Sequence, residues 1–226
     1  MAVRRKKRYT GFKDEYGQDS SDTNAPGQSP LQKGTPVFGA QVLFMKIFVA
    51  SDIHGSATGC DSMIEAFHRE KADRMILLGD LLYHGPRNDL PDGYEPKKVI
   101  DLLNGLNTAV YCVRGNCEAE VDQMVLNFPV MADYALFPYG DRMIFVTHGH
   151  VFNTSHLPPL RKGDILLHGH THIPAWEEHE EYWYLNPGSV SIPKNGTPKG
   201  YMIFEAGNVV WKTLEGEEYH RICLYE

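Results

Sequence analysis

The chain has 226 residues, 42% of them hydrophobic and 11% aromatic, and its formal net charge is −7 at pH 7. This length can fill one hydrophobic core and is short for two full-sized domains. The sequence contains no run of about 18 apolar residues, so we expect no membrane-spanning helix. The basic residues from Arg4 to Arg8 are not followed by the apolar stretch that a secretory signal peptide has. The four cysteines are scattered without CxxC spacing, which is typical of reduced thiols in a cytoplasmic protein.

Charge and composition divide the chain near residue 45. Residues 1–44 contain seven Lys and Arg against four Asp and Glu, a net charge of +3, so residues 45–226 carry −10. Residues 11–39 are dense in Gly, Ser, Asp, Asn, Gln and Pro, without helical or strand periodicity. We therefore expect residues 1–44 to be a disordered extension and residues 45–226 to form one domain. Alternatively, the basic run from Arg4 to Arg8 tethers the chain to nucleic acid or a membrane.

From residue 45 onward, apolar runs and helical spacings alternate along the chain. Buried strands are predicted at residues 46–50, 74–78, 109–113, 143–146, 165–167, 182–185, 201–204 and 209–213. Amphipathic helices are predicted around residues 63–67 and 99–106. The alternation of strands and helices in the first half predicts an α/β fold, and the strand-rich second half predicts a second sheet packed on the first.

Five of the predicted strands end in a small polar cluster beside a glycine. Because open α/β sheets bind ligands at the carboxyl ends of their strands, these loops should converge at one edge. Asp52 and His54 are two residues apart, so on an extended strand end they point the same way, and His170 and His172 repeat this spacing. The polar residues are Asp52, His54, Asp80, Asn116, His148, His170 and His172.

These side chains offer carboxylate, imidazole and amide donors. Seven ligands exceed the roughly four of a tetrahedral zinc site but suit two ions that share a bridging carboxylate. No thiolate stands at a ligand position, which favours Mn, Fe, Zn or Ni over a cysteine-rich structural zinc. The net charge of −10 on residues 45–226 also argues against a nucleic-acid groove, since phosphate binding there needs a basic stripe. Bound metal would instead supply the positive charge for a phosphate ester.

The order of these motifs resembles that of the calcineurin-like metallophosphoesterases. The resemblance spans nearly all of the chain from Met45, and it extends to the loop from Asp80 to Asn88 and to the segment from Asn186 to Val190, as in the small YfcE-type phosphodiesterase branch. The motifs that carry it are Asp52-Ile53-His54, Gly79-Asp80, Gly115-Asn116, His148-Gly149-His150 and Gly169-His170-Thr171-His172.

The resemblance implies a four-layer αββα sandwich, in which two packed mixed β-sheets are flanked by helices. It implies one metal ion on Asp52, His54 and His172, and a second on Asn116, His148 and His170, with Asp80 bridging them. Members of this branch are usually manganese-dependent hydrolases and are commonly homo-oligomers. Two such ions activate a water, hold the phosphate oxygens and neutralise charge during an in-line displacement. The catalytic set carried over in this way is Asp80, Asn116 and His148.

One position departs from many family members. Where these carry a His that protonates the leaving group, this chain has Cys117, as its branch does. A thiol, with an ordinary pKa of about 8.5, is a poor donor to a basic alkoxide, so diesters with good leaving groups should be favoured over monoesters. His84 or Arg114 is an alternative donor or charge-stabilising group. Arg87 is expected to contact substrate, although a turn after Gly85 explains it almost as well.

Other readings of the sequence remain open at this stage. Arg114 is either a substrate contact or a structural ion-pair partner, and His150 is expected to orient a metal ligand. The same site would serve a phosphomonoesterase, a nucleotide pyrophosphatase or a nuclease. The alternative outside the enzymes is a protein-interaction scaffold with this fold. Exposed aromatic residues around Tyr83, Tyr94 and Phe128 are expected to support a homo-oligomer.

Overall fold

The computed structural model of the protein describes residues 45–106 and 110–225, so the expected extension over residues 1–44 lies outside the described residues. The elements in the first half are β1 (Ile47–Ala50), α1 (Ala57–Glu70), β2 (Arg74–Leu77), α2 (Pro96–Asn104), β3 (Val110–Cys112) and α3 (Glu120–Val125). Those in the second half are β4 (Tyr134–Tyr139), β5 (Arg142–Thr147), β6 (Asp164–Leu167), β7 (Pro174–Glu178), β8 (Tyr182–Pro187), β9 (Gly200–Glu205), β10 (Asn208–Thr213) and β11 (Glu218–Cys223).

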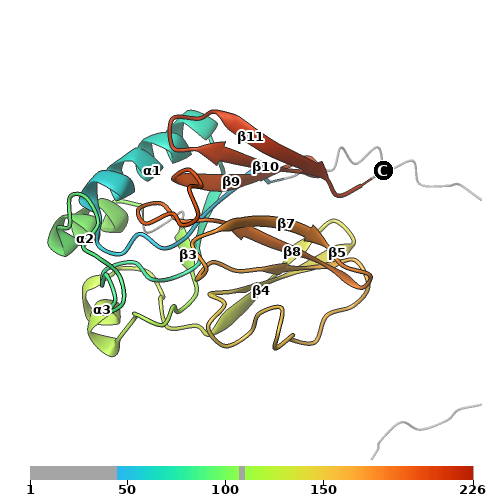
Figure 1. The fold of residues 1–226 in the computed structure, drawn as a ribbon, viewed down its shortest axis with the longest axis horizontal. Coiled ribbons are helices and arrows are strands. Elements are labelled where there is room, and N and C mark those ends of the chain that lie inside the picture. The colour runs from blue at the N-terminus through green and yellow to red at the C-terminus, as the bar shows by residue number, and fades with distance from the viewer. Residues whose placement is uncertain (1–44, 107–109, 226) are drawn as a thin grey trace, which may run out of the picture. The chain divides into compact units, whose positions relative to one another are not determined.

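The strands form two mixed sheets that lie one on the other in Figure 1. The first sheet has the order β11-β10-β9-β1-β2-β3, with β1, β2 and β3 parallel and the remaining pairs antiparallel. The second has the order β4-β5-β6-β8-β7, with β5, β6 and β8 parallel and an antiparallel strand at each edge. Helices α1 and α2 lie together on the outer face of the first sheet (Figure 1).

Strand alternation divides the core into two parts on either side of the first sheet. In β1, Phe48 and Ala50 pack toward the helices, whereas Ile47 and Val49 pack between the sheets. The pattern follows from the two-residue period of a strand. A strand covered on both faces reads as a continuous apolar run, which is why the central strands are visible in the sequence.

Local signals set the two long helices. Ser56 caps α1 by accepting a hydrogen bond from the Gly59 N–H at 3.1 Å, and Lys71 ends the helix in the left-handed region at φ 52°. Pro96 begins α2, where its missing N–H has no helical partner to lose. Both helices therefore start at residues suited to that position, and α1 also ends at one.

The fold class expected from the sequence is confirmed, with two packed mixed sheets and few helices. On the outer face of the second sheet, Phe145, Leu166, Tyr182 and Tyr184 form a small cluster that Phe152 and Leu160 cover from the irregular segment between β5 and β6. The short helix α3 buries none of its residues. In the described part of the chain, helices thus cover the first sheet and a loop covers the second.

All eight predicted strands and both predicted helices occur, with small shifts at their ends. Three further strands and one helix were not predicted, namely β4, β7, β11 and α3. Each of these strands lies at an edge of its sheet. Within the described residues, no helix is both long enough and apolar enough to cross a membrane.

The core between the sheets should dominate the free energy of unfolding. Leu167 on β6 is fully buried there, and we expect Leu167→Ala to lower the free energy of unfolding by about 2–5 kcal/mol, because it removes buried methyl groups and leaves a cavity. Urea denaturation would measure this. Leu90→Ala, at a position 62% exposed, is the control and should change the value by less than about 0.5 kcal/mol. Equal effects of the two variants would contradict the assignment of this core.

Candidate metal centre

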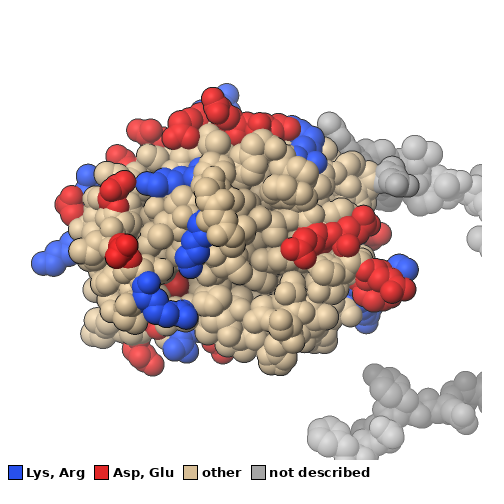
Figure 2. All heavy atoms as spheres, in the orientation of Figure 1, with Lys and Arg blue, Asp and Glu red and all other residues tan. Residues whose placement is uncertain are grey.

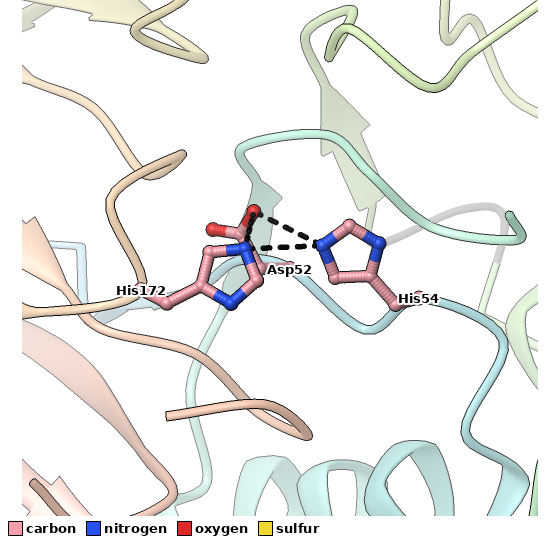
Figure 3. A group of neighbouring side chains, drawn as sticks. All are labelled: Asp52, His54 and His172. Atoms are coloured by element: carbon pink, nitrogen blue, oxygen red, sulfur yellow. Dashed lines mark hydrogen bonds and ion pairs between the residues drawn. The ribbon is translucent and has the colours of Figure 1, made fainter. Parts of the chain in front are cut away.

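Three of the expected ligands form one cluster where β1 and β6 end. Figure 3 shows the rings of His54 and His172 turned toward one another and toward the Asp52 carboxylate. The Nε2 atoms of His54 and His172 are 3.2 Å apart. Asp52 Oδ1 lies 3.6 Å from the first of these nitrogens and 3.3 Å from the second. Three donor atoms therefore converge on one point.

A second cluster lies beside it and shares a carboxylate with it. His148 Nε2 is 3.1 Å from Asn116 Oδ1 and 3.1 Å from His170 Nδ1. Asp80 Oδ2 is 3.4 Å from His148 Nε2 and 3.6 Å from His54 Nε2. This oxygen thus stands between the two groups, the position that a bridging ligand requires.

Backbone carbonyls fix three of the imidazoles in one tautomer. The Nδ1 atoms of His54, His148 and His172 lie 2.8, 2.6 and 2.6 Å from the carbonyl oxygens of Tyr83, Leu78 and Ile192 respectively. A carbonyl oxygen only accepts, so each Nδ1 donates and each neutral ring presents its Nε2 lone pair to the site. Metal-binding imidazoles are oriented in this way.

The carboxylates of Asp52 and Asp80 are each held in place by hydrogen bonds to one oxygen, and the other oxygen faces the imidazoles. Asp52 Oδ2 accepts hydrogen bonds from the Ser51 hydroxyl at 2.6 Å and the His170 N–H at 3.0 Å. Asp80 Oδ1 accepts one from the Cys117 N–H at 2.9 Å. Among the described residues, Asp52 Oδ1 is buried without a hydrogen-bond partner. Such an atom beside facing lone pairs is what a bound cation would satisfy, so these residues fit a metal centre.

The site attracts positive charge. Burial opposes ionisation of Asp52, but the adjacent imidazoles of His172 and His54 outweigh it and hold the pKa of this carboxyl well below its usual range. Burial also works against a charged His148, yet the Asp80 carboxylate beside it raises the pKa of this imidazole to about 9. The buried carboxylates therefore stay ionised and stabilise a positive charge between them, whether a proton on His148 or a metal ion.

The backbone of the ligand loops is strained. Five of the seven expected ligands have left-handed φ values between 50° and 65°, namely Asp52, His54, Asp80, His170 and His172. A non-glycine residue in this region costs about 1–2 kcal/mol. The sequence argument that paired ligands point the same way along an extended strand was wrong in its reason, because β1 ends at Ala50 and β6 at Leu167. Left-handed turns, rather than strand alternation, bring the side chains together, and they send His170 and His172 to different clusters.

Two glycines allow the loops to approach. A Cβ at Gly79, whose φ is 94°, would meet the backbone of Gly115, and a Cβ at Gly115 would collide with Asp80 and Glu118. The loops after β2 and β3, which carry Asp80 and Asn116, are therefore in backbone contact. Glycine is required by space at both positions, and at Gly79 by conformation as well.

Glu118 joins these two loops and was not identified from the sequence. Its buried carboxylate accepts hydrogen bonds from the N–H groups of Leu81 at 2.7 Å, Asp80 at 2.9 Å and Gly115 at 2.5 Å. Burial and the nearby Asp80 raise the pKa of Glu118, while these three N–H groups act in the opposite direction. The sequence did contain a clue to Glu118, since this acidic residue directly follows Asn116-Cys117 in the loop of an expected ligand.

A cavity of about 440 Å³ opens over the second cluster. Of the expected substrate contacts, Arg87 and Cys117 line it, together with Asn88 and with Lys194, which the sequence did not suggest. The other residues in its wall are Asp80, Gly85, Pro86, Asn116, His170, Thr171 and His172. Figure 2 shows Lys and Arg side chains running down the middle of one face, while Asp and Glu gather over β10 and β11.

Three expected residues lie elsewhere. His84 packs against the rings of Tyr83 and Tyr94 and does not line this cavity, and neither does Arg114. His150 lies beside His148, with ring centroids 5.4 Å apart, but its Nδ1 has no partner among the described residues. The expectation of exposed aromatic residues was correct for Tyr83 and wrong for Phe128, which is only 2% exposed because it packs into the core under the helices.

Two stacked mixed sheets, with carboxylate and imidazole donors converging at the strand ends, define the metallophosphoesterase class. The chain belongs to the calcineurin-like phosphoesterase superfamily, whose domain profile matches residues 45–208.

Several relatives support this assignment. Phosphodiesterase YfcE of Escherichia coli (strain K12) is 48% identical over 157 residues, which cover 70% of this chain and 85% of that protein. The solved structure of E. coli Yfce, a phosphoesterase, matches with a TM-score of 0.78 at 42% identity, covering 80% of this chain and 100% of that one. Phosphodiesterase MJ0936 of Methanocaldococcus jannaschii is 25% identical over 162 residues, 68% of this chain and 89% of its own length.

Vps29 of Entamoeba histolytica, solved in complex with Zn²⁺, has a TM-score of 0.52 at 19% identity, covering 80% of this chain and 100% of that one. At this identity the match shows the fold alone.

Glu118 offers a test of how the loops are held. We expect Glu118→Gln to lower the free energy of unfolding by about 1–3 kcal/mol, because the amide accepts with one oxygen and leaves a buried N–H without a partner. Metal affinity should fall about 10- to 100-fold, since the loops carrying Asp80 and Asn116 lose their link. Urea denaturation and metal titration would measure both effects. Glu120→Gln, at the exposed neighbouring acid, is the matched control, and equal behaviour of the two variants would refute this role.

Proposed function

We propose that this chain is a metal-dependent phosphodiesterase that holds two divalent cations, with Asp52, His54 and His172 around one, Asn116, His148 and His170 around the other, and Asp80 between them. The observation that carries the proposal is the position of Asp80 Oδ2, within 3.6 Å of donor nitrogens in both clusters. The relatives YfcE and MJ0936, both named phosphodiesterases, support the reaction type.

Mn²⁺ is the proposed ion, with Zn²⁺, Fe²⁺ and Ni²⁺ as alternatives. The donors are oxygen and nitrogen atoms, and the one cysteine at the site, Cys117, lines the cavity beside the second cluster. Carboxylate, amide and imidazole donors suit these first-row ions better than a thiolate-rich site would. When bound, such a pair supplies Lewis acidity toward the phosphate and a nucleophilic water.

The protein's own residues then position the ester. The Asp80 carboxylate and the Asn116 side chain line the cavity, and the fully buried His148 ring lies behind them. A phosphate seated there lies against Asp80 and Asn116. Arg87 and Lys194, both in the cavity wall, are placed to offset the charge of the phosphate oxygens. His84 and Arg114 do not line this cavity, and we propose that they support it rather than touch the substrate.

Cys117 favours diesters. Burial, with the nearby Asp80 carboxylate, raises the pKa of this thiol above its ordinary range. A thiol held in its neutral form donates a proton to an alkoxide less readily than an imidazolium does. Esters whose leaving group needs no acid, such as aryl diesters, are therefore the proposed substrates. The second candidate function is that of a phosphomonoesterase or a nucleotide pyrophosphatase acting at the same site. The complete set of proposed ligands argues against a protein scaffold without enzymatic activity.

We also propose a cytoplasmic location and a small-molecule substrate. All four cysteines lie in the described part of the chain and each is free, as in a reducing compartment. The net charge of −10 on residues 45–226 opposes binding of long nucleic acids. Tyr83, 44% exposed beside the cavity loop, is available for the homo-oligomer that the sequence led us to expect.

Metal content tests the binuclear assignment. We expect the protein loaded with Mn²⁺ to contain about two ions per chain, and His172→Ala and His148→Ala each to retain less metal and to lose turnover of an aryl phosphodiester. Elemental analysis after gel filtration would measure the first effect. His179→Ala removes an exposed imidazole on the β7–β8 turn and should behave as wild type. A fully active protein after complete metal removal would sink the proposal.

Substitution of Cys117 tests the leaving-group preference. We expect Cys117→His to raise kcat for an alkyl monoester, whose alkoxide leaving group needs a proton, by about 10- to 100-fold relative to an aryl diester, because an imidazole at this position can donate the proton that the thiol withholds. Steady-state kinetics on both esters would show it, and Cys117→Ser is the control that supplies no better acid. An unchanged ratio of monoester to diester turnover would contradict the role assigned to Cys117.

A further inference from the structure

A second cavity of about 460 Å³ adjoins the first along the loop that carries His170. His170 and Thr171 line both this cavity and the one that holds Arg87 and Lys194. A ligand in the second cavity therefore lies next to a phosphate at the proposed metal centre. None of the roles assigned above uses this space.

The wall between the two cavities is rigid. The Asn186 side-chain nitrogen lies 2.9 Å from the Gly169 carbonyl oxygen, 3.0 Å from the Thr171 hydroxyl and 3.0 Å from the Tyr184 hydroxyl, and its two N–H groups are shared among these three acceptors. Asn186 is itself fully buried. The loop is thus tied to β8 at both ends of its turn, and the two cavities keep a fixed relation to each other.

The chemistry of the second cavity differs from that of the first. The His168 ring stacks on Tyr184 with centroids 4.5 Å apart, and the apolar groups of Ile173, Pro174 and Ala175 continue the wall. Among the described residues that line it, Glu177 is charged and none is Lys or Arg. The first cavity, by contrast, presents Arg87 and Lys194. An anionic group fits the first cavity, and an uncharged ring or chain fits the second.

We propose that the second cavity binds the organic group that stays on the phosphorus, while the leaving group occupies the first cavity beside Cys117. This inference rests on the proposed phosphodiesterase function. In the reaction the oxygen of water bonds to phosphorus, the bond from phosphorus to the leaving oxygen breaks, and a proton from water ends on the released alcohol or phenol. The retained ester bond stays intact, and its substituent remains against His168 and Tyr184.

The test compares two diesters with the same charge and the same leaving group, phenyl p-nitrophenyl phosphate and methyl p-nitrophenyl phosphate. Wild type should hydrolyse the phenyl ester with a kcat/KM at least about tenfold higher, since a ring in an apolar pocket is worth roughly one to two powers of ten. Ser155→Trp at the exposed rim and Ala175→Leu in the wall both fill the cavity. Each should lower kcat/KM for the phenyl ester and reduce the preference below about threefold, with the methyl ester little affected.

Leu157→Trp is the matched control, because Leu157 is exposed on the same segment and does not line the cavity. It should keep the wild-type preference. Equal kcat/KM for the two esters in wild type, or an equal loss on both in the two filled variants, would overturn the inference and leave the phosphodiesterase function standing. Turnover of neither ester by the manganese-loaded wild type would overturn the proposed function, and the inference with it.

Discussion

The Nε2 atoms of three imidazoles and one oxygen from each of two carboxylates face one another within 3.2–3.6 Å at the ends of the strands. Unless a proton or a metal ion lies between them these atoms repel each other, and no rotation relieves them, since carbonyl oxygens hold the other nitrogen of His54, His148 and His172. The fold must therefore hold them together before metal binds. Much of the surrounding structure serves this constraint, from the buried hydrogen bonds of Glu118 to the glycine contact between the loops after β2 and β3.

Both sheets share the task of holding the site. The loops after β1, β2 and β3 come from the first sheet, and those after β5 and β6 come from the second. The apolar residues between the sheets, among them Val49, Leu78, Val146 and Leu167, directly precede these loops and are fully buried. Each ligand loop is therefore anchored by a strand end that cannot move without opening the core. This rigidity lets Asp52 and four other proposed ligands persist at left-handed φ values, because the strain is small beside the free energy of the packed strands.

Burial decided which parts of this structure could be predicted from the sequence. Central strands such as β1 and β9 are covered on both faces and read as apolar runs. The missed strands β7 and β11 are edge strands that expose many of their residues, so neither an apolar run nor a strict alternation marks them. The third missed strand, β4, is an apolar run that contains Pro138, and a proline counts against a strand except at a sheet edge, where β4 lies. Ligands at strand ends were visible because they follow such runs and adjoin glycine. Glu118 was not visible, because it acts through backbone N–H groups of another loop. Lys194 was not visible either, because it reaches the cavity from the loop after β8, far along the chain from the other residues of the wall.

The charge around the site gives an independent reason to prefer diesters. Asp52, Asp80 and Glu118 place three buried carboxyl groups next to the phosphate position, and residues 45–226 carry a net −10. A phosphomonoester brings nearly two negative charges at neutral pH, whereas a diester brings one. Two divalent cations would offset the charge of the nearest carboxylates. Any further negative charge on the ester would depend on Arg87 and Lys194, which are exposed and therefore screened by solvent. A diester carries a single negative charge, which these two cations and side chains can offset. It also has two organic groups, one for each cavity, whereas a monoester has only one.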